Sequence, residues 1–302
     1  MDLLLKRRRI IASQRGEDTK DYTKRPLTFK CLTGGDLFIK NRNGSYDRNF
    51  EYSLNGGAWT AFDLPKNTAS KLIATLSPND TISFRRDADN FADAQFISDS
   101  NLTFDIYGNL LSLQYGSAFN GQTKLRNTSK KAFGETFKET NVVDASKLML
   151  TASTLSNGCY YAMFYGCTSL INAPELPATT IAQDCYREMF KNCSSLVHVP
   201  NKLPATTLAN NCYSSMFKAC SNILTAPELP AATLVSGCYS WMFNACSQLS
   251  YVKCLAKNNL IYNNIAGWLG NVSNTGTFVK ASGVTWPSNS NSIPNGWTVI
   301  EE

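Results

Sequence analysis

The segment ANNCYSSMFKACSNILTAPELPAATL (209–234) is one of four similar segments that fill the second half of the chain. The others are LSNGCYYAMFYGCTSLINAPELPATTI (155–181), AQDCYREMFKNCSSLVHVPNKLPATTL (182–208) and VSGCYSWMFNACSQLSYVKCLA (235–256). Their equivalent cysteines and methionines recur every 26 or 27 residues, and a weaker copy around Phe133 and Phe137 precedes them. A fixed period of this length is typical of repeat proteins and predicts about five stacked coils.

Each repeat contains the motif CYxxMFxxC, followed by an extended segment. The apolar residues of the motif, such as Cys185 and Met189, stand at positions i, i+1, i+4, i+5 and i+8. This spacing predicts one face of a short helix. Leu196 then opens a short strand that ends near Pro200, because proline cannot donate to a β-ladder. One such unit cannot bury its own apolar face but stacked units can, so we expect a solenoid with Phe190 in its interior.

The motif CYxxMFxxCxxL…APELPATT resembles the BspA-type leucine-rich repeats of Bacteroidetes surface proteins and of phages that infect these bacteria. The segments YVKCLA (251–256), GTFVK (276–280) and IPNGWTVI (293–300) resemble the C-terminal cap of that family, and YGNLLSLQYG (107–116) resembles its approach to the repeats. The resemblance implies a leucine-rich-repeat-type solenoid. It also implies a function in adhesion and partner binding.

The residues before the repeats have a different pattern. Residues 26–115 contain short strand-like runs separated by turn signals, and Asn55-Gly56-Gly57 is a strong hairpin signal. We expect a β-sandwich-like domain there, either a spacer or a sugar-binding module. The fold class is then α+β or mostly β. Its parts are a basic N-terminal tail (1–25), a β-sandwich-like domain (26–115), a leucine-rich-repeat solenoid (116–254) and a C-terminal cap (255–302).

The net charge of +6 is concentrated at the N-terminus, where residues 1–30 hold nine Lys or Arg and four acids. The nearly neutral remainder argues against a nucleic-acid-binding surface, which would need a basic face. The tail LLLKRRRII is expected to anchor the protein to an acidic partner; the alternatives are a frayed terminus and a weak nucleic-acid arm. The anchoring residues would be Leu3, Leu4, Leu5, Arg7, Arg8 and Arg9.

The ten cysteines raise the question of disulfides and metals. Within a coil the two cysteines are eight residues apart. On a helix that is about 12 Å, too far for a disulfide. Two interpretations stay open: a ladder of small buried side chains, or bridges between equivalent cysteines of adjacent coils. The chain has no closely spaced Cys/His set for zinc and only one histidine, so we expect no metal, no cofactor and no catalytic residue.

Two acidic features offer weaker hypotheses. Glu175 and Glu228 occupy equivalent positions two coils apart, at about 10 Å, slightly beyond the carboxylate separation of an inverting glycosidase. Simple repetition explains them as well. The cluster Asp87-Ala-Asp89-Asn90-Phe-Ala-Asp93 offers oxygen ligands for calcium, but it lacks the Gly and the distal Glu of an EF-hand loop. We expect residues 87–93 to form a solvated loop.

Solenoids bind partners on the stacked surface whose side chains vary from coil to coil. One variable column, in the extended segments, consists of Asn172, His198, Thr225 and Tyr251. The other, in the segments predicted to be helical, consists of Ala162, Glu188, Ser215 and Trp241. Trp241 is either a sugar or protein contact or a residue packed against the cap. We hypothesise that the end carrying Trp241 and Tyr251 contributes to binding.

These observations favour a non-enzymatic binding protein. No run of about 18 apolar residues occurs, so we expect no membrane insertion. The N-terminus does not resemble a secretory signal, and its short arginine-rich stretch resembles those of tailed-phage structural proteins. The favoured hypothesis is a virion-surface protein, a fibre, tail or head-decoration component assembled in the host cytoplasm. Residues 1–25 would contact other virion proteins, and the solenoid would contact a host-surface glycan or protein. A bacterial cell-surface adhesin is the alternative, and a glycan-active enzyme is third; a homo-oligomer is compatible with each.

Overall fold

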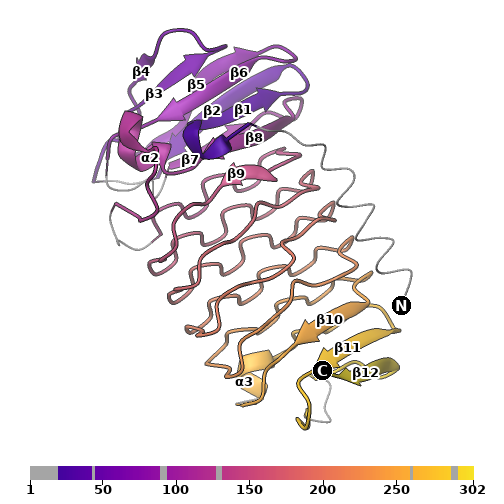
Figure 1. The fold of residues 1–302 in the computed structure, drawn as a ribbon. Coiled ribbons are helices and arrows are strands. Elements are labelled where there is room, and N and C mark those ends of the chain that lie inside the picture. Colours follow the sequence, from indigo (N-terminus) through magenta and orange to yellow (C-terminus); the bar gives the residue numbers. More distant parts are fainter. Residues whose placement is uncertain (1–19, 43–44, 89–93, 127–130, 259–260, 287–291) are drawn as a thin grey trace.

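The computed structural model describes residues 20–302 except 43–44, 89–93, 127–130, 259–260 and 287–291. The protein is mostly β, with strands gathered at its two ends and stacked coils between them (Figure 1). The strands are β1 (Leu27–Cys31), β2 (Gly35–Asn41), β3 (Phe50–Leu54), β4 (Thr60–Phe62), β5 (Thr68–Leu76), β6 (Thr81–Arg85), β7 (Ala94–Ser98), β8 (Phe104–Asn109), β9 (Lys147–Met149), β10 (Tyr251–Cys254), β11 (Gly276–Lys280) and β12 (Trp297–Glu301). The short helices are η1 (Tyr22–Lys24), α2 (Ser112–Tyr115), η2 (Gly116–Ala118) and α3 (Tyr262–Ile265). In these described ranges, no helix has the length and apolar character needed to cross a bilayer.

The N-terminal part consists of two β-sheets whose apolar faces meet. One sheet has the strand order β4-β3-β6-β1-β8-β9 and the other has the order β5-β2-β7. The rings of Phe29 in β1 and Phe84 in β6 lie 4.9 and 4.8 Å from the ring of Phe96 in β7, measured between centroids. The predicted hairpin is confirmed, because β3 and β4 pair antiparallel and Asn55 and Gly56 have φ angles of 51° and 72°.

The CYxxMFxxC segments form rows of β-turns, so the predicted helices are wrong. Every second N–H bonds to the carbonyl three residues back, as Cys159 N–H does to the Ser156 oxygen at 3.2 Å. The N–H groups between them bond to the next repeat, as Tyr160 N–H does to the Cys185 oxygen at 2.9 Å. The same alternation recurs in residues 182–193, 209–220 and 235–246. An α-helix would instead direct each N–H to the carbonyl four residues back in the same segment.

A left-handed residue at every fourth position produces these turn rows. In the first repeat Gly158, Ala162 and Gly166 have φ angles of 62°, 49° and 71°. Their counterparts with positive φ are Asp184, Glu188, Asn192, Asn211, Ser215, Ala219, Gly237, Trp241 and Ala245. A conformational period of four keeps residues i, i+4 and i+8 on one side, whereas a helix of 3.6 residues per turn drifts by about 40° over four residues. This is why the cysteines and the methionine of each motif all point inward.

The other side of each repeat is extended and forms a parallel ladder with its neighbours. Parallel bridges join Asn172 to His198 and Thr225 to Tyr251. The ladder ends in the parallel sheet β10-β11-β12. At its other end β9 pairs in parallel with β8 of the N-terminal sheet (Figure 1). The strands before the repeats therefore provide a hydrogen-bonded template for the first coil.

A column of aromatic rings runs through the interior of the repeats. The rings of Phe164, Phe190 and Phe217 stack with centroid distances of 5.5 Å. The column continues through Phe137 to Phe96 of the N-terminal sheets, and buried residues of both parts belong to one hydrophobic core. Phe190 is 0% exposed, in agreement with its predicted interior position.

The ten cysteines are all buried and all free. Cys193 donates its Sγ–H to the carbonyl oxygen of Phe164 in the preceding repeat, at 3.0 Å. The same contact recurs at Cys167, Cys220 and Cys246. Burial raises the pKa of the Cys167 thiol to about 12. Of the two interpretations of the cysteines, the structure supports the ladder of small buried side chains.

Candidate functional site

The predicted column Asn172, His198, Thr225 and Tyr251 lies half-buried on the extended side of the repeats. The parallel bridges place Asn172 beside His198 and Thr225 beside Tyr251. The row continues at both ends. At one end Asp144 bridges to Asn172. At the other end Tyr251 pairs with Thr277, and Thr277 pairs with Thr298. We call this row the polar column: Asp144, Asn172, His198, Thr225, Tyr251, Thr277 and Thr298.

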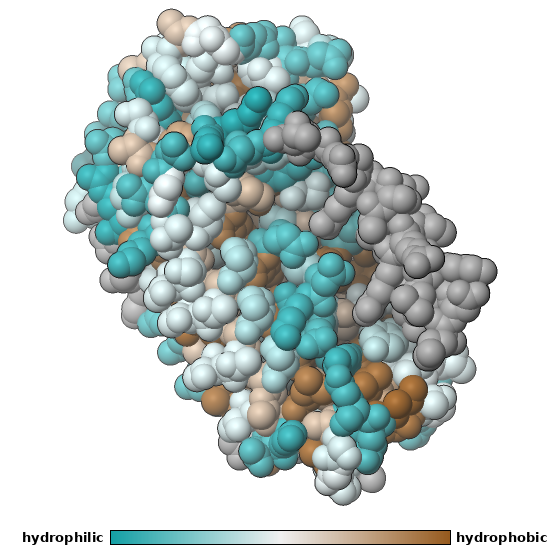
Figure 2. Space-filling model, in the orientation of Figure 1, coloured by the Kyte–Doolittle hydropathy of each residue, from teal (hydrophilic) through white to brown (hydrophobic). Residues whose placement is uncertain are grey.

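The two ends of the molecule differ in surface character. In the orientation of Figure 2, hydrophilic side chains cover much of the N-terminal sheets and the repeats, and hydrophobic ones gather over β10, β11 and β12. Val299 and Ile300 of β12 are 44% and 47% exposed. On this face the N-terminal end is therefore the more hydrophilic end of the molecule.

A cavity of about 380 Å³ opens at the hydrophilic end, beside Asp144. Its cationic lining consists of Lys20, Arg25, Lys30 and Lys147, and Tyr22, Tyr107, Asp105 and Ile106 complete it with Asp144. Strand register brings these residues together, since Lys30 of β1 lies opposite Asp105 of β8, and Tyr107 of β8 lies opposite Lys147 of β9. The cavity thus forms at the junction between the N-terminal sheet and the first coil.

Tyr22 positions two of these cations. Its ring meets the ring of Tyr107 edge-on, with centroids 5.4 Å apart. The Arg25 guanidinium carbon lies 5.9 Å from the Tyr22 centroid, and Lys147 Nζ lies 5.4 Å from it. The attraction of each cation to the ring face is electrostatic, and Arg25 is also hydrogen-bonded to the side chain of Tyr107. The arrangement holds both positive charges at the cavity wall.

The carboxylates of the cavity also interact. Burial raises the pKa of Asp105, the negative charge of Asp144 raises it further, and Lys30 and Lys147 only partly oppose these effects. Among the described residues, four cationic and two acidic side chains line the cavity, and Lys20 and Lys147 also have other interactions. The described lining therefore offers both cationic groups and hydrogen-bond acceptors.

The carboxylates considered for a glycosidase do not form a matched acid–base pair. Glu228 is ion-paired with Lys202 at 3.2 Å and with Lys253 at 3.3 Å, and Lys253 also meets Glu302 at 2.8 Å. Burial alone would raise the pKa of Glu228, but the hydrogen bonds from the two lysines outweigh it and the pKa is lowered. A general acid needs a raised pKa. Glu175 is exposed on the surface, so repetition explains these residues better.

Trp241 is both exposed and packed against the C-terminal segment, and its contact with a ligand stays a prediction. Its side chain is 43% exposed, and Lys218 Nζ lies 4.8 Å from the centroid of its ring. The ring also packs on the C-terminal segment, because a Cβ at Gly267 would stand 2.8 Å from its Cε3 atom. Trp241 belongs to a turn row, however, whereas Tyr251 lies on the extended side, in β10. The structure does not bring the two residues together.

The other members of the Trp241 column offer little surface for a ligand. Ala162 and Ser215 are buried, and Glu188 is half-buried and pairs with Lys191 at 3.3 Å. Of the two variable columns, the polar column of the extended side is the better candidate for binding.

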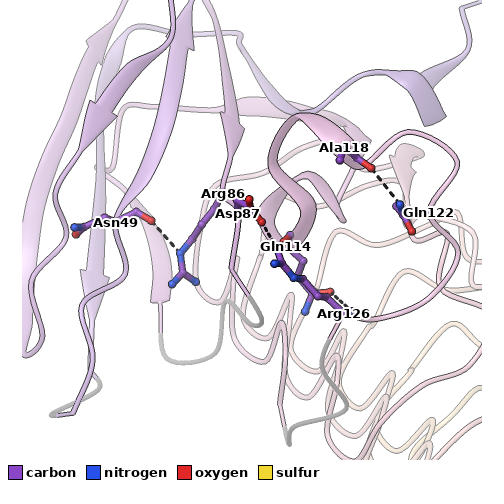
Figure 3. Close-up of polar contacts among 7 residues, drawn as sticks. All are labelled: Asn49, Arg86, Asp87, Gln114, Ala118, Gln122 and Arg126. Carbon is purple, nitrogen blue, oxygen red and sulfur yellow. Dashed lines mark hydrogen bonds and ion pairs between the residues drawn. The ribbon is translucent and has the colours of Figure 1, made fainter.

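The acidic segment 87–93 is described only at its start. Asp87 forms an ion pair with Arg126, whose Nη1 also donates to the Gln114 carbonyl oxygen at 2.9 Å (Figure 3). A carboxylate that faces a guanidinium is a poor calcium ligand. Asp89, Asn90 and Asp93 lie outside the described residues, as do the anchoring residues Leu3, Leu4, Leu5, Arg7, Arg8 and Arg9. Across the described parts of the chain, no group of three His, Cys, Asp or Glu side chains is arranged to hold a metal ion.

Comparison of the chain with protein-family models, with curated proteins and with solved structures finds no match. The resemblance to BspA-type repeats therefore depends on the motif itself, and function must be argued from the surface.

The cavity was not anticipated from the sequence. Successive side chains of a strand point to opposite faces of the sheet. In the segments LTFK and FDIY, Lys30 therefore points away from Phe29, and Asp105 and Tyr107 point away from Ile106. That signal identifies the outward residues of each strand. It does not reveal that β1 pairs with β8 and β8 with β9, because these pairings join segments far apart in the sequence.

Proposed function

We propose that the protein is a non-enzymatic structural and host-binding component of a tailed bacteriophage particle. Its N-terminal tail would attach to other virion proteins, and a leucine-rich-repeat-type solenoid would contact a glycan or protein of the host surface. The observation that carries the proposal is the polar column. There the backbone ladder repeats while the side chains change from Asn172 to His198, Thr225 and Tyr251. A constant scaffold with side chains that change from repeat to repeat is how stacked repeats recognise partners.

The stacking supports a solenoid of this kind. Turn rows on one side and parallel bridges on the other connect each repeat to the next, and the aromatic column fills the space between them. At the C-terminal end Trp268 stacks on Tyr239, with centroids 6.2 Å apart, and so covers the last coil. A terminal unit that seals the core is what a stack of repeats needs for solubility.

The virion assignment has two supports. The basic stretch at residues 6–9 resembles the N-termini of tailed-phage structural proteins. The ten free, buried cysteines mean that the fold requires no disulfide, which suits assembly in a reducing host cytoplasm before release by lysis.

Immunogold electron microscopy tests the proposal. Antibody against this chain is applied to phage from a lysate of gut Bacteroidetes and to the uninfected host. Label on particles is expected, and its position on head or tail defines the structure that carries the protein. Label confined to cells would overturn the phage assignment and make the protein a bacterial adhesin. Purified protein should also compete with phage for adsorption to the host.

A further inference from the structure

We propose that the extended side of the repeats binds an uncharged polysaccharide that lies along the polar column, with one sugar unit beside each coil. This inference names the ligand class for the proposed host-binding function and therefore rests on it. Two neighbouring sets of side chains form the binding surface. The first is the part of the polar column that belongs to the repeats: Asn172, His198, Thr225 and Tyr251. The second, which we call the apolar ridge, consists of Ile171, Val197 and Leu224.

The apolar ridge extends across three coils. Each of its members directly precedes a member of the polar column, and the three side chains are 39%, 38% and 37% exposed. Val197 N–H bonds to the carbonyl oxygen of Ile171 at 3.1 Å, so neighbouring coils are in contact at this position. Single exposed apolar side chains are ordinary on protein surfaces, whereas contiguous ones mark binding sites. The C–H face of a sugar ring is an apolar surface, and its burial on such a ridge is favourable.

The surface around the two sets has no ionic side chain of its own. Its segments are 168–174, 194–200, 221–227 and 247–252, and none of them contains Asp, Glu, Lys or Arg. Ionic side chains stand at its borders, as Asp144 does beside Asn172 and Lys253 does after Tyr251. A charged polymer would lose hydration on this surface without gaining a counter-charge, so the surface favours an uncharged ligand.

The polar column supplies hydrogen-bonding groups that are not engaged elsewhere. Within the described part of the chain, four side chains form no hydrogen bond or ion pair with another residue: Asn172, His198, Thr225 and Tyr251. Amide, imidazole and hydroxyl groups donate and accept hydrogen bonds, and the hydroxyls of a sugar do the same. A ligand with hydroxyls at its edge and C–H groups on its face therefore matches both sets.

The spacing of the coils favours a polymer over a single sugar. Neighbouring strands lie about 4.8 Å apart, and one pyranose unit of an extended polysaccharide advances by a similar length. Parallel bridges set this spacing between Asn172 and His198 and between Thr225 and Tyr251. Successive sugar units would therefore meet equivalent positions of successive coils. Affinity should then rise with each added unit until every coil from Asn172 to Tyr251 is occupied.

Titration calorimetry on the full chain tests the inference. The uncharged probes are the extended, β-linked oligomers of xylose, glucose and mannose, each from dimer to hexamer, and oligogalacturonate is the charged probe. We expect one uncharged series to bind best. We also expect its affinity to rise from dimer to tetramer and then to level off.

Matched variants locate the ligand on the extended side. Leu224→Ser removes one member of the apolar ridge and should weaken binding of that series by about fivefold. Leu72→Ser is the control, because Leu72 is 45% exposed but lies on β5 of the N-terminal sheets, and it should leave the affinity unchanged. His198→Ala changes the polar column instead and should weaken binding by a similar factor. It serves as the second variant should Leu224→Ser fail to fold in a thermal melt.

Host cells distinguish a glycan ligand from a protein ligand. Binding of the purified chain to these cells should be lost after periodate, which cleaves sugar diols, and should persist after protease. The opposite result would overturn the inference in favour of a protein receptor.

Several calorimetric results would also overturn the inference. These are the absence of binding by every uncharged series, tighter binding of oligogalacturonate, and an affinity that is the same for dimer and tetramer. A loss of affinity in L72S as large as in L224S would place the ligand away from the apolar ridge. None of these outcomes affects the immunogold test or the competition with phage for adsorption, so failure of this inference is distinguishable from failure of the host-binding proposal.

Discussion

Replacing alanine by glycine in the turn rows should stabilise the protein, although the same change destabilises a helix. Ala219 and Ala245 have φ angles of 61° and 62° and are half-buried, and their counterparts in earlier repeats are Gly166 and Asn192. A left-handed conformation costs a non-glycine residue about 1–2 kcal/mol. Glycine adds about 0.4–1 kcal/mol of conformational entropy to the unfolded chain. The difference is a net gain of about 0.5–1 kcal/mol per site.

Guanidinium unfolding of the double variant A219G/A245G measures this effect. We expect its free energy of unfolding to rise by about 1–2 kcal/mol, whereas two glycines in helices would lower it by about 2 kcal/mol. Ala209, in the same repeat as Ala219 and also half-buried, has no positive φ and is the matched control. A209G should lose about 0.5–1 kcal/mol. A double variant that is less stable than the parent would refute the turn-row argument.

Other predictions concern the core, the thiols and the C-terminal packing. Phe190→Ala should lower the free energy of unfolding by about 3–5 kcal/mol in a thermal melt. The control Val197→Ala should lower it little, because Val197 lies in the same repeat and is 38% exposed. A loss under about 1 kcal/mol at Phe190 would contradict its interior position. Burial raises the pKa of Cys167 to about 12. The stability from the thiols is therefore complete below the unfolded pKa of about 8.5 and is lost as the pH rises toward 12. The free energy of unfolding should be constant from about pH 6 to 8 and then fall by about 1.4 kcal/mol per pH unit for each such thiol. An unchanged free energy of unfolding at about pH 10.5 would be inconsistent with this. Gly267→Ala should destabilise by about 1–3 kcal/mol and alter tryptophan fluorescence, because its Cβ would meet the Trp241 ring; an unchanged spectrum would argue against that contact.

The repeat and its buried residues could be predicted from the sequence because the period of 26 or 27 residues shows which side chains are equivalent. Helix and turn row could not be distinguished from the apolar spacing, since both bring residues four apart to one side over so short a segment. A second signal was present. The column of Gly158, Asp184, Asn211 and Gly237 contains only residues that tolerate a left-handed backbone, which is atypical of a helix. The next left-handed position of each row obscured this signal, because it is occupied by residues that do not favour a positive φ: Ala162, Glu188, Ser215 and Trp241.

The candidate site was predictable in part. Alignment of the repeats predicted that Asn172, His198, Thr225 and Tyr251 form a column, and the parallel bridges place two pairs of them side by side. The extension of the column into the cavity was not predictable, because it depends on the pairing of β8 with β9. Pairing between strands separated by many residues is set by packing of the whole chain and leaves no local pattern.

The hydrogen bonds between turn rows have a consequence for the evolution of the molecule. Tyr160 N–H now meets the carbonyl of Cys185, and Cys185 occupies the same place in its row as Cys212. Loss of residues 182–208 would present the carbonyl of Cys212 to the same N–H group and leave both ends of the stack intact. Gain or loss of a whole repeat would therefore lengthen or shorten the protein in whole steps. Each step would change the order of the side chains along the polar column without a new fold.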